Sequence, residues 1–121
     1  MTEDELQQLL EKTLPAADRH GVFVEACQDQ DVRLRFSLEP EGAWSSAALL
    51  SLADTSLRAA AGLGSSLTHL SVTVLRTPQD ADVLALSRVI RRDGGTVHAE
   101  TWLFSHAVVE PMLHATATLK G

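Results

Sequence analysis

An acidic residue, Asp54, lies near the middle of a segment that otherwise consists mainly of small and apolar side chains. The segment runs from Ser45 to Ala61, and its composition predicts a helix that is apolar over most of its circumference. Such a helix is normally buried, and Asp is among the residues least often buried without a partner. Because burying a carboxylate is costly, Asp54 needs either a structural partner or a chemical task.

Two interpretations of Asp54 stay open. Arg58 follows four residues later and can form an ion pair with it on the helix surface, in a narrow polar stripe with Ser51. Alternatively, Asp54 is a base or nucleophile at the mouth of a groove, where a low dielectric raises its basicity. Thr68, at the start of the next predicted strand, is the nearest candidate for a hydroxyl partner, with an ordinary strand threonine as the alternative.

Other kinds of active site find little support in the sequence. The five histidines are scattered, with no cysteine pair and no His-x-x-x-His on a helix, so we expect no metal site. No Gly-rich segment joins a strand to a helix, and no Gly-x-Ser-x-Gly motif occurs. Cys27 falls in a predicted strand, which favours a buried structural cysteine over a nucleophile.

Length and composition predict one domain, residues 1–121, with a single core. The formal charge of −6 argues against sequence-independent nucleic-acid binding, which requires a positive surface. The single cysteine excludes an intrachain disulfide and favours a reducing compartment. We find no signal-peptide pattern and no apolar run of the roughly 20 residues that a membrane helix needs, so we expect a cytoplasmic protein without a membrane partner.

Hydrophobic periodicity predicts two helices and five to six strands. Thr2 and Glu5 form a capping-box signature for a first helix, which Pro15 is expected to end. The predicted strands cover 22–27, 32–38, a segment through Leu70, Val72 and Val74, and then 83–92, 96–105 and 112–119.

Turn residues separate these elements. Polar residues 28–31 and the Asp93-Gly94-Gly95 sequence predict hairpins, residues 39–44 predict a loop, and 77–80 and 109–111 predict turns. Gly62 and Gly64 stand where a left-handed cap of the long helix is expected.

The order of elements is helix, hairpin, long helix and then a meander of about four strands. This order suggests an α+β fold in which an antiparallel sheet curls around the long helix. One sheet covers only one side of that helix. Self-association would cover the other face and the sheet edges.

These elements and several of their residues resemble the hot-dog fold acyl-CoA thioesterases, in particular the small single-domain enzymes related to the phenylacetate pathway and to 4-hydroxybenzoyl-CoA. The resemblance runs from about Val22 to Leu119. It is strongest at residues 47–55, which resemble a small-residue helix that ends in Leu-Ala-Asp-Thr. The next strand with its Arg-Pro ending (68–78), the basic hairpin (89–94) and the last strand (115–119) are also similar.

The resemblance implies roles for four residues. Asp54 would be the general base or nucleophile, and Thr68 would orient the attacking water. The backbone N–H groups of Ser46 and Ala47 would receive the oxyanion, as suits a helix N-terminus. In this fold the site usually forms between two subunits, so these roles can come from different chains.

The chain departs from the family pattern at the helix start. Ser45-Ser46-Ala47 stands where the family usually has His-Gly-Gly, and Glu39 stands where it often has Asn. Backbone N–H groups survive these replacements, but the added side chains can crowd the substrate, and Glu39 places negative charge beside the oxyanion. A catalytically silent module that binds an acyl-CoA or CoA therefore stays open, as does a purely structural oligomer.

The resemblance also implies a homodimer or homotetramer that acts on an acyl-CoA, with coenzyme A as part of the substrate and no other cofactor. Four arginines in the second half of the chain suit its phosphates, with solvated strand ends as the alternative. They are Arg76, Arg88, Arg91 and Arg92. Trp44, Trp102 and Phe104 either line an acyl pocket or pack in a core or interface.

Overall fold

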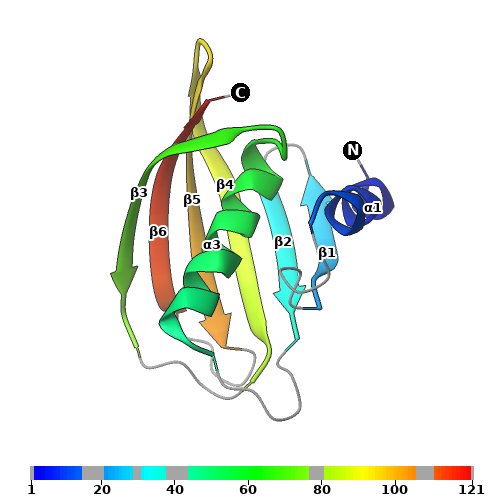
Figure 1. Cartoon of the computed structure of the whole chain (residues 1–121), viewed down its shortest axis with the longest axis vertical. Helices are drawn as coiled ribbons and strands as arrows, with labels where there is room; N and C mark the ends of the chain where they lie inside the picture. Colours follow the sequence, from blue (N-terminus) through cyan, green and yellow to red (C-terminus); the bar gives the residue numbers. More distant parts are fainter. Residues whose placement is uncertain are drawn as a thin grey trace.

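The computed structural model describes residues 2–14, 21–28, 31–37, 44–76, 81–105 and 111–120. Two helices and six strands lie within these residues, and Figure 1 labels them. In chain order they are α1 (Glu3–Thr13), β1 (Phe23–Gln28), β2 (Asp31–Phe36), α3 (Ser46–Ala61), β3 (Ser66–Val74), β4 (Val83–Asp93), β5 (Thr96–Ser105) and β6 (Pro111–Lys120). The predicted elements are therefore confirmed, with bounds that shift by one or two residues. Residues 39–43 of the loop predicted at 39–44, the turn predicted at 77–80 and residues 109–110 of the turn predicted at 109–111 lie outside the described residues.

The helix caps follow from local side-chain chemistry. The Thr2 side chain accepts a hydrogen bond from the Glu5 N–H while the Glu5 carboxylate accepts one from the Thr2 N–H, which confirms the capping box. Ser45 caps α3 by accepting from the Ala48 N–H at 3.1 Å. At the other end of α3, Gly62 has a φ of +129° and a ψ of 127°, which is not the predicted left-handed cap. Its N–H nevertheless closes the helix by donating to the Arg58 carbonyl.

The strands form one antiparallel sheet in the order β1-β2-β4-β5-β6-β3. The hairpins β1–β2 and β4–β5 are confirmed, and Gly94 takes a φ of +65° in the second turn. The predicted four-strand meander is wrong in one respect: β4, β5 and β6 are consecutive neighbours, but β3 pairs with β6 at the far edge of the sheet. After α3, the chain crosses over the end of the sheet to reach that edge (Figure 1).

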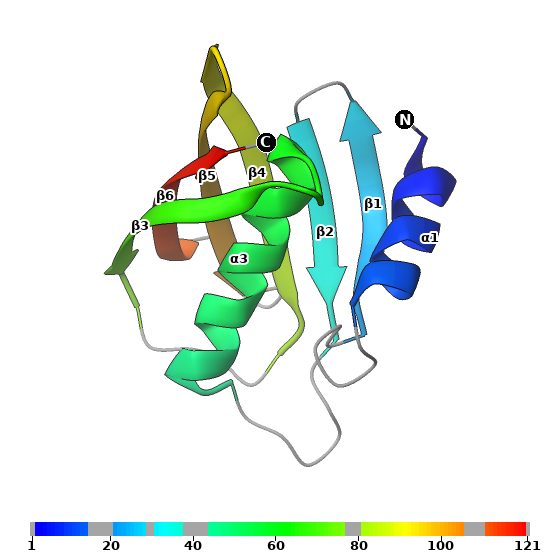
Figure 2. The same cartoon turned by 45° about the horizontal axis from the view of Figure 1, so that its top comes forward.

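The sheet curves around α3, and α1 packs beside β1 at the opposite edge from β3 (Figure 2). The helix face toward the sheet is apolar, and Leu52, Ala53 and Leu57 are fully buried there. The Ser56 side chain is also fully buried, and its hydroxyl donates a hydrogen bond to the Leu52 carbonyl. The buried O–H donor is therefore satisfied within the helix. Buried strand residues of the opposing sheet face, such as Leu34 and Leu103, complete the core.

Side chains alternate between two faces of the sheet because strand periodicity is two. On β5, residues 97, 99, 101 and 103 are buried toward α3, as the alternation of the sequence predicts. The residues between them, at 98, 100, 102 and 104, lie on the opposite face, which we call the outer face. Any side chain of the sheet is thus assigned to the helix side or the outer side by its register.

Leu57→Ala is expected to lower the free energy of unfolding by about 2–5 kcal/mol, because it leaves a cavity between α3 and the sheet. Urea denaturation monitored by circular dichroism measures the change. Leu50→Ala on the same helix is the matched control, since Leu50 is 42% exposed. Equal losses for the two variants would contradict the orientation of α3.

Candidate functional site

Asp54 lies on α3, with a side chain that is 33% exposed in the single chain. Both of its carboxylate oxygens accept hydrogen bonds from Arg58, at 3.0 Å from Nε and at 3.0 Å from Nη2. The structure therefore contains the ion pair that the i,i+4 spacing predicts. This two-point contact fixes the direction of the carboxylate on the helix surface.

The side of α3 that faces away from the sheet carries Asp54 and Arg58 together with the exposed Ala47 and Leu50 and the half-buried Ser51. These positions recur at intervals of three and four residues, which places them on one stripe along the helix. The stripe combines small and apolar side chains with one carboxylate and one guanidinium. The stripe is the side of α3 that a substrate or a second protein chain can reach.

Ser46 and Ala47 occupy the first turn of α3 and are exposed. Within the part of the chain that the structure describes, their backbone N–H groups have no hydrogen-bond acceptor, whereas the Ala48 N–H is taken by the Ser45 side chain. Unpaired N–H groups at a helix N-terminus carry partial positive charge. This end of the helix can therefore receive an anionic oxygen, and the oxyanion role of Ser46 and Ala47 stays a prediction.

Thr68 lies near the start of β3, at an irregularity in the pairing with β6. Its side chain is exposed and its hydroxyl donates to the Thr118 carbonyl at 2.9 Å. The oxygen of that hydroxyl can still accept a hydrogen bond from water. The structure is thus compatible with either interpretation of Thr68.

The predicted catalytic groups do not come together within one chain. Asp54 follows Ala47 by seven residues, which corresponds to about 10 Å along the helix axis. Thr68 follows the C-terminal end of α3, whereas Ser46 begins its N-terminal end (Figure 1), and the 16 residues of α3 separate these ends by about 24 Å. A single carbonyl group cannot contact the helix start and Asp54 of the same chain at once.

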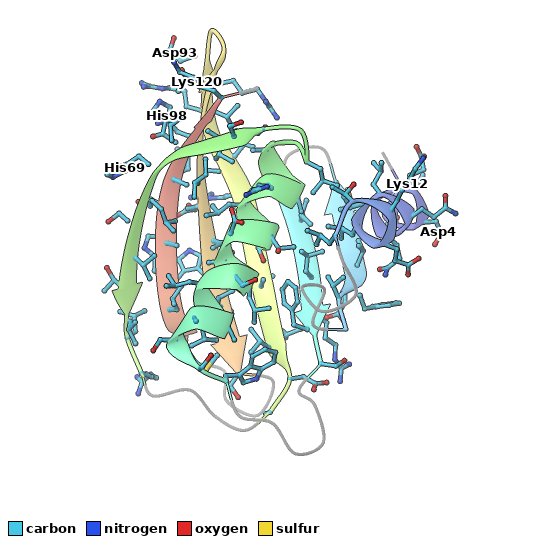
Figure 3. All side chains as sticks on the ribbon, viewed as in Figure 1. Asp4, Lys12, His69, Asp93, His98 and Lys120 are labelled. Atoms are coloured by element: carbon cyan, nitrogen blue, oxygen red, sulfur yellow. The ribbon has the colours of Figure 1, made fainter. Side chains whose placement is uncertain are left out.

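The four arginines also occupy different places. Arg91 and Arg92 lie near the β4–β5 hairpin, where Arg92 donates to the Ala61 carbonyl at the C-terminal end of α3 and Arg91 lies 3.7 Å from Asp93. Arg76 follows β3 at the opposite end of the sheet, as its N–H bond to the Met112 carbonyl shows. Arg88 lies on the outer face, away from α3. Arg91 pairs with His98 on the outer face and lies near it and Asp93 at the exposed hairpin (Figure 3), whereas Arg92 pairs with Val97 on the helix side. The structure therefore does not gather the side chains of the four arginines in one place.

The aromatic residues divide in the same way. Trp44 is buried in the core and its indole N–H donates to the Ala81 carbonyl at 2.7 Å. Trp102 and Phe104 are half-buried on the outer face. Cys27 is half-buried, and burial raises the pKa of its thiol, which disfavours the nucleophilic thiolate.

Two further observations concern the described ranges alone. They contain no group of three or more His, Cys, Asp or Glu side chains that could hold a metal ion. No helix among them is long and apolar enough to cross a membrane. Glu39, the predicted acidic neighbour of the oxyanion, lies outside them.

Several solved structures superimpose on nearly the whole chain. A thioesterase from Haemophilus influenzae is 16% identical, with coverage of 99% of this chain and 90% of that one and a TM-score of 0.82. Thioesterase superfamily member 2 from Mus musculus is 12% identical, with coverage of 98% and 96% and a TM-score of 0.83. The PaaI protein from the phenylacetic acid degradation operon of E. coli is 14% identical, with coverage of 99% and 95% and a TM-score of 0.80.

The chain has the hot-dog fold. This confirms the fold class that the resemblance implies: an antiparallel sheet wrapped around a long helix, with an additional N-terminal helix. No family model matches the sequence, and no curated protein matches it. At these low identities, the shared architecture alone is established.

The outer face of the hot-dog sheet carries a charged cluster that sequence reasoning missed. Glu100, whose side chain is 11% exposed, accepts from Arg88 Nε at 2.6 Å and lies 3.0 Å from His114 Nε2. The His114 ring in turn lies 4.0 Å from the Trp102 ring, centroid to centroid. These residues come from β4, β5 and β6, so only the strand register brings them together. The one sequence signal for this cluster is the alternation of side chains along β5, which places Glu100 and Trp102 on the same face.

The hydrogen bond to His114, followed by the contacts with Arg88, holds the pKa of Glu100 below its ordinary value, although desolvation opposes this shift. The carboxylate therefore stabilises the folded state at pH values above its unfolded-state pKa. That contribution is lost as the pH falls through the lower folded-state pKa.

Glu100→Gln is expected to flatten the acid limb of the stability profile, because the variant has no carboxylate to protonate at this position. Urea unfolding at a series of pH values from about 6 down to about 3, close to ordinary carboxyl pKa values, measures the slope. Glu25→Gln is the control, since the one ion pair that Glu25 makes in the described part of the chain is the long, 3.8 Å contact with Arg33. An unchanged slope in Glu100→Gln would contradict the assigned role of the cluster.

Proposed function

We propose that this protein hydrolyses an acyl-CoA thioester to a free acid and CoA, at a site shared between two copies of the chain. The observation that carries the proposal is that the exposed stripe of α3 bears both an oriented carboxylate, Asp54, and the unpaired N–H groups of the helix N-terminus. The fold is shared with proteins named as thioesterases, which supports the same reaction class.

The chemistry follows from where charge develops. Water attacks the thioester carbonyl carbon while Asp54 accepts a proton from it, or Asp54 attacks directly and water then hydrolyses the anhydride. The carbonyl oxygen becomes an oxyanion that accepts hydrogen bonds from the Ser46 and Ala47 N–H groups. Breaking the C–S bond releases the CoA thiolate, which takes up the proton. Thr68 accepts a hydrogen bond from the attacking water and orients it.

Two copies are needed because one chain separates the helix start from Asp54 by about two helical turns. A two-fold axis that sets two α3 helices antiparallel would place the N-terminus of one beside Asp54 of the other. β3 suits this arrangement, because it is a nine-residue strand at the edge of the described sheet and its Val74 side chain is 63% exposed. Antiparallel pairing of two β3 strands would extend the sheet across the dimer, and a tetramer would repeat this unit.

The CoA moiety is substrate, and we propose no other cofactor. Arg92 is placed to meet its phosphates near the end of α3, with Arg91 beside it on the outer face of the same hairpin and Arg76 at the opposite end of the partner's sheet. Arg88 could contact CoA only from a different subunit, because the sheet lies between it and α3 of its own chain. A cytoplasmic location completes the proposal, since Cys27 is the only cysteine and a reducing compartment suits it.

A catalytically silent acyl-CoA-binding or CoA-binding module is the second candidate. Arg58 favours it, because both oxygens of Asp54 are engaged in the ion pair and must be released before this carboxylate can act as a base or nucleophile. The two functions differ in one measurement: CoA raises the melting temperature in either case, but only an enzyme releases thiol.

Asp54→Ala is expected to lower kcat for thiol release from a panel of acyl-CoAs by about 100-fold or more, as loss of a general base or nucleophile does. Ser51→Ala, on the same stripe and one turn away, is the matched control and should retain activity. Thiol release is measured with a chromogenic disulfide. Equal activity in Asp54→Ala and the wild type would refute the role of Asp54, and no turnover by any of them would favour the binding module.

Mixing Asp54→Asn with Ala47→Pro tests the shared site. Proline is tolerated in the first turn of a helix but removes the N–H, so each variant alone should be inactive. After subunit exchange, half of the dimers are mixed and each holds one intact site, which predicts about a quarter of wild-type activity for a two-fold dimer. Absence of recovery, in a mixture that mass spectrometry shows to have exchanged, would count against the site.

A further inference from the structure

The register of the sheet aligns side chains in rows across the outer face. Ala26 on β1 pairs with Arg33 on β2, Arg33 with Leu86 on β4, and Leu86 with Trp102 on β5. In the next row, Gln28 pairs with Asp31 and Asp31 with Arg88. These seven residues line a groove of about 310 Å³, together with Val32 and Ser87. The groove lies on the opposite side of the sheet from α3 and Asp54.

The base of the groove is apolar. Its lining includes the apolar side chains of Ala26, Leu86 and Trp102, and Leu86 is 40% exposed although it is a large hydrophobic residue. The small side chain of Ala26 leaves space between its neighbours. The volume is at the lower end of the range for small-molecule pockets, about 300–1,000 Å³, so the groove suits a short apolar group.

Two guanidinium groups flank this apolar base. Arg88 uses Nε to bind Glu100, and its terminal nitrogens make no hydrogen bond within the residues that the structure describes. Its side chain is 63% exposed. Among the residues that the structure describes, the one ion pair of Arg33 is its 3.8 Å contact with Glu25, and its side chain is 48% exposed. Both arginines can therefore donate hydrogen bonds to a ligand.

The Glu100 cluster fixes two walls of the groove. Glu100 anchors Arg88 at 2.6 Å, and His114, which bonds Glu100, stacks against Trp102 at 4.0 Å. One wall is thus an oriented guanidinium and the next is an oriented indole. The groove lining contains two arginines, Arg33 and Arg88, and one carboxylate, Asp31. The formal charge of the lining is therefore positive, in a chain whose net charge is −6.

We propose that this outer-face groove binds a small monocarboxylate with an apolar tail. The tail lies on Trp102 and Leu86, and the carboxylate accepts hydrogen bonds from the terminal nitrogens of Arg88 and from Arg33, which match a carboxylate in geometry and charge. The inference does not require the proposed hydrolysis, because the groove and Asp54 lie on opposite faces of the sheet. Free acids released by thioester hydrolysis belong to the same chemical class.

Hexanoate is the probe, and the indole N–H signals of the two tryptophans in an NMR spectrum of the full-length protein report on binding. Titration is expected to shift the Trp102 signal saturably. The Trp44 signal should stay in place, because that indole is buried on the helix side and bonded to the Ala81 carbonyl. Trp102→Phe assigns the two signals. Hexan-1-ol is the neutral comparison and should bind more weakly.

Arg88→Gln should weaken hexanoate binding by about tenfold or more, as loss of a charged hydrogen bond does. Arg33→Gln should also weaken it, and this variant leaves the Arg88–Glu100 pair intact if the first one proves unstable. Arg91→Gln is the matched control: it is an exposed, ion-paired arginine of the same strand outside the groove, and binding should be unchanged. Asp54→Asn should also bind hexanoate normally, which keeps this test separate from that of the hydrolysis.

Three results would overturn the proposal. The Trp102 signal could stay unmoved by hexanoate, hexan-1-ol could bind as tightly as hexanoate, or both arginine variants could bind like the wild type. The first result, combined with a smaller particle mass for Leu86→Asp in light scattering, would identify the groove as a contact between copies of the chain.

Discussion

The burial of one face of α3 against the curved sheet is the constraint on which the other features depend. Leu52 and Leu57 have no exposed surface there, and the hydroxyl of Ser56 is satisfied inside the helix itself. This packing leaves α3 one possible orientation about its axis. The opposite stripe, with Asp54 and Arg58, must then face away from the sheet. The accessibility of the carboxylate is therefore a consequence of hydrophobic packing on the other side of the helix.

A rigid helix also fixes distances. The first-turn N–H groups at Ala47 and the carboxylate of Asp54 lie on one stripe but about two turns apart, and no side-chain rotation closes that gap. A reaction that uses both must recruit a second helix. β3 is an edge strand and the stripe of α3 faces away from the sheet, and a symmetric contact between two chains is the simplest way to cover such surfaces.

The sheet divides the charged residues between two environments. Arg92 reaches the C-terminal carbonyl of α3 at Ala61, where a cation complements the helix dipole. Arg88 lies on the outer face and bonds Glu100, which is also bonded to His114. A carboxylate that is 11% exposed is tolerated at this position because two partners offset its desolvation. Residues that are close in sequence on β4 therefore serve different surfaces.

Local patterns in the sequence determined the elements, because caps, periodicity and turn residues act within a few positions. Thr2 and Gly94 each behave as their neighbours predict. The i,i+4 contact of Asp54 with Arg58 was also local and predictable. The position of β3 beside β6 was not, since strand order depends on pairing between distant segments. For the same reason, only the tertiary structure could separate Arg88 from Arg92 and join Glu100 to His114. Contacts of that kind are set by register across the sheet, which the order of residues along one strand does not specify.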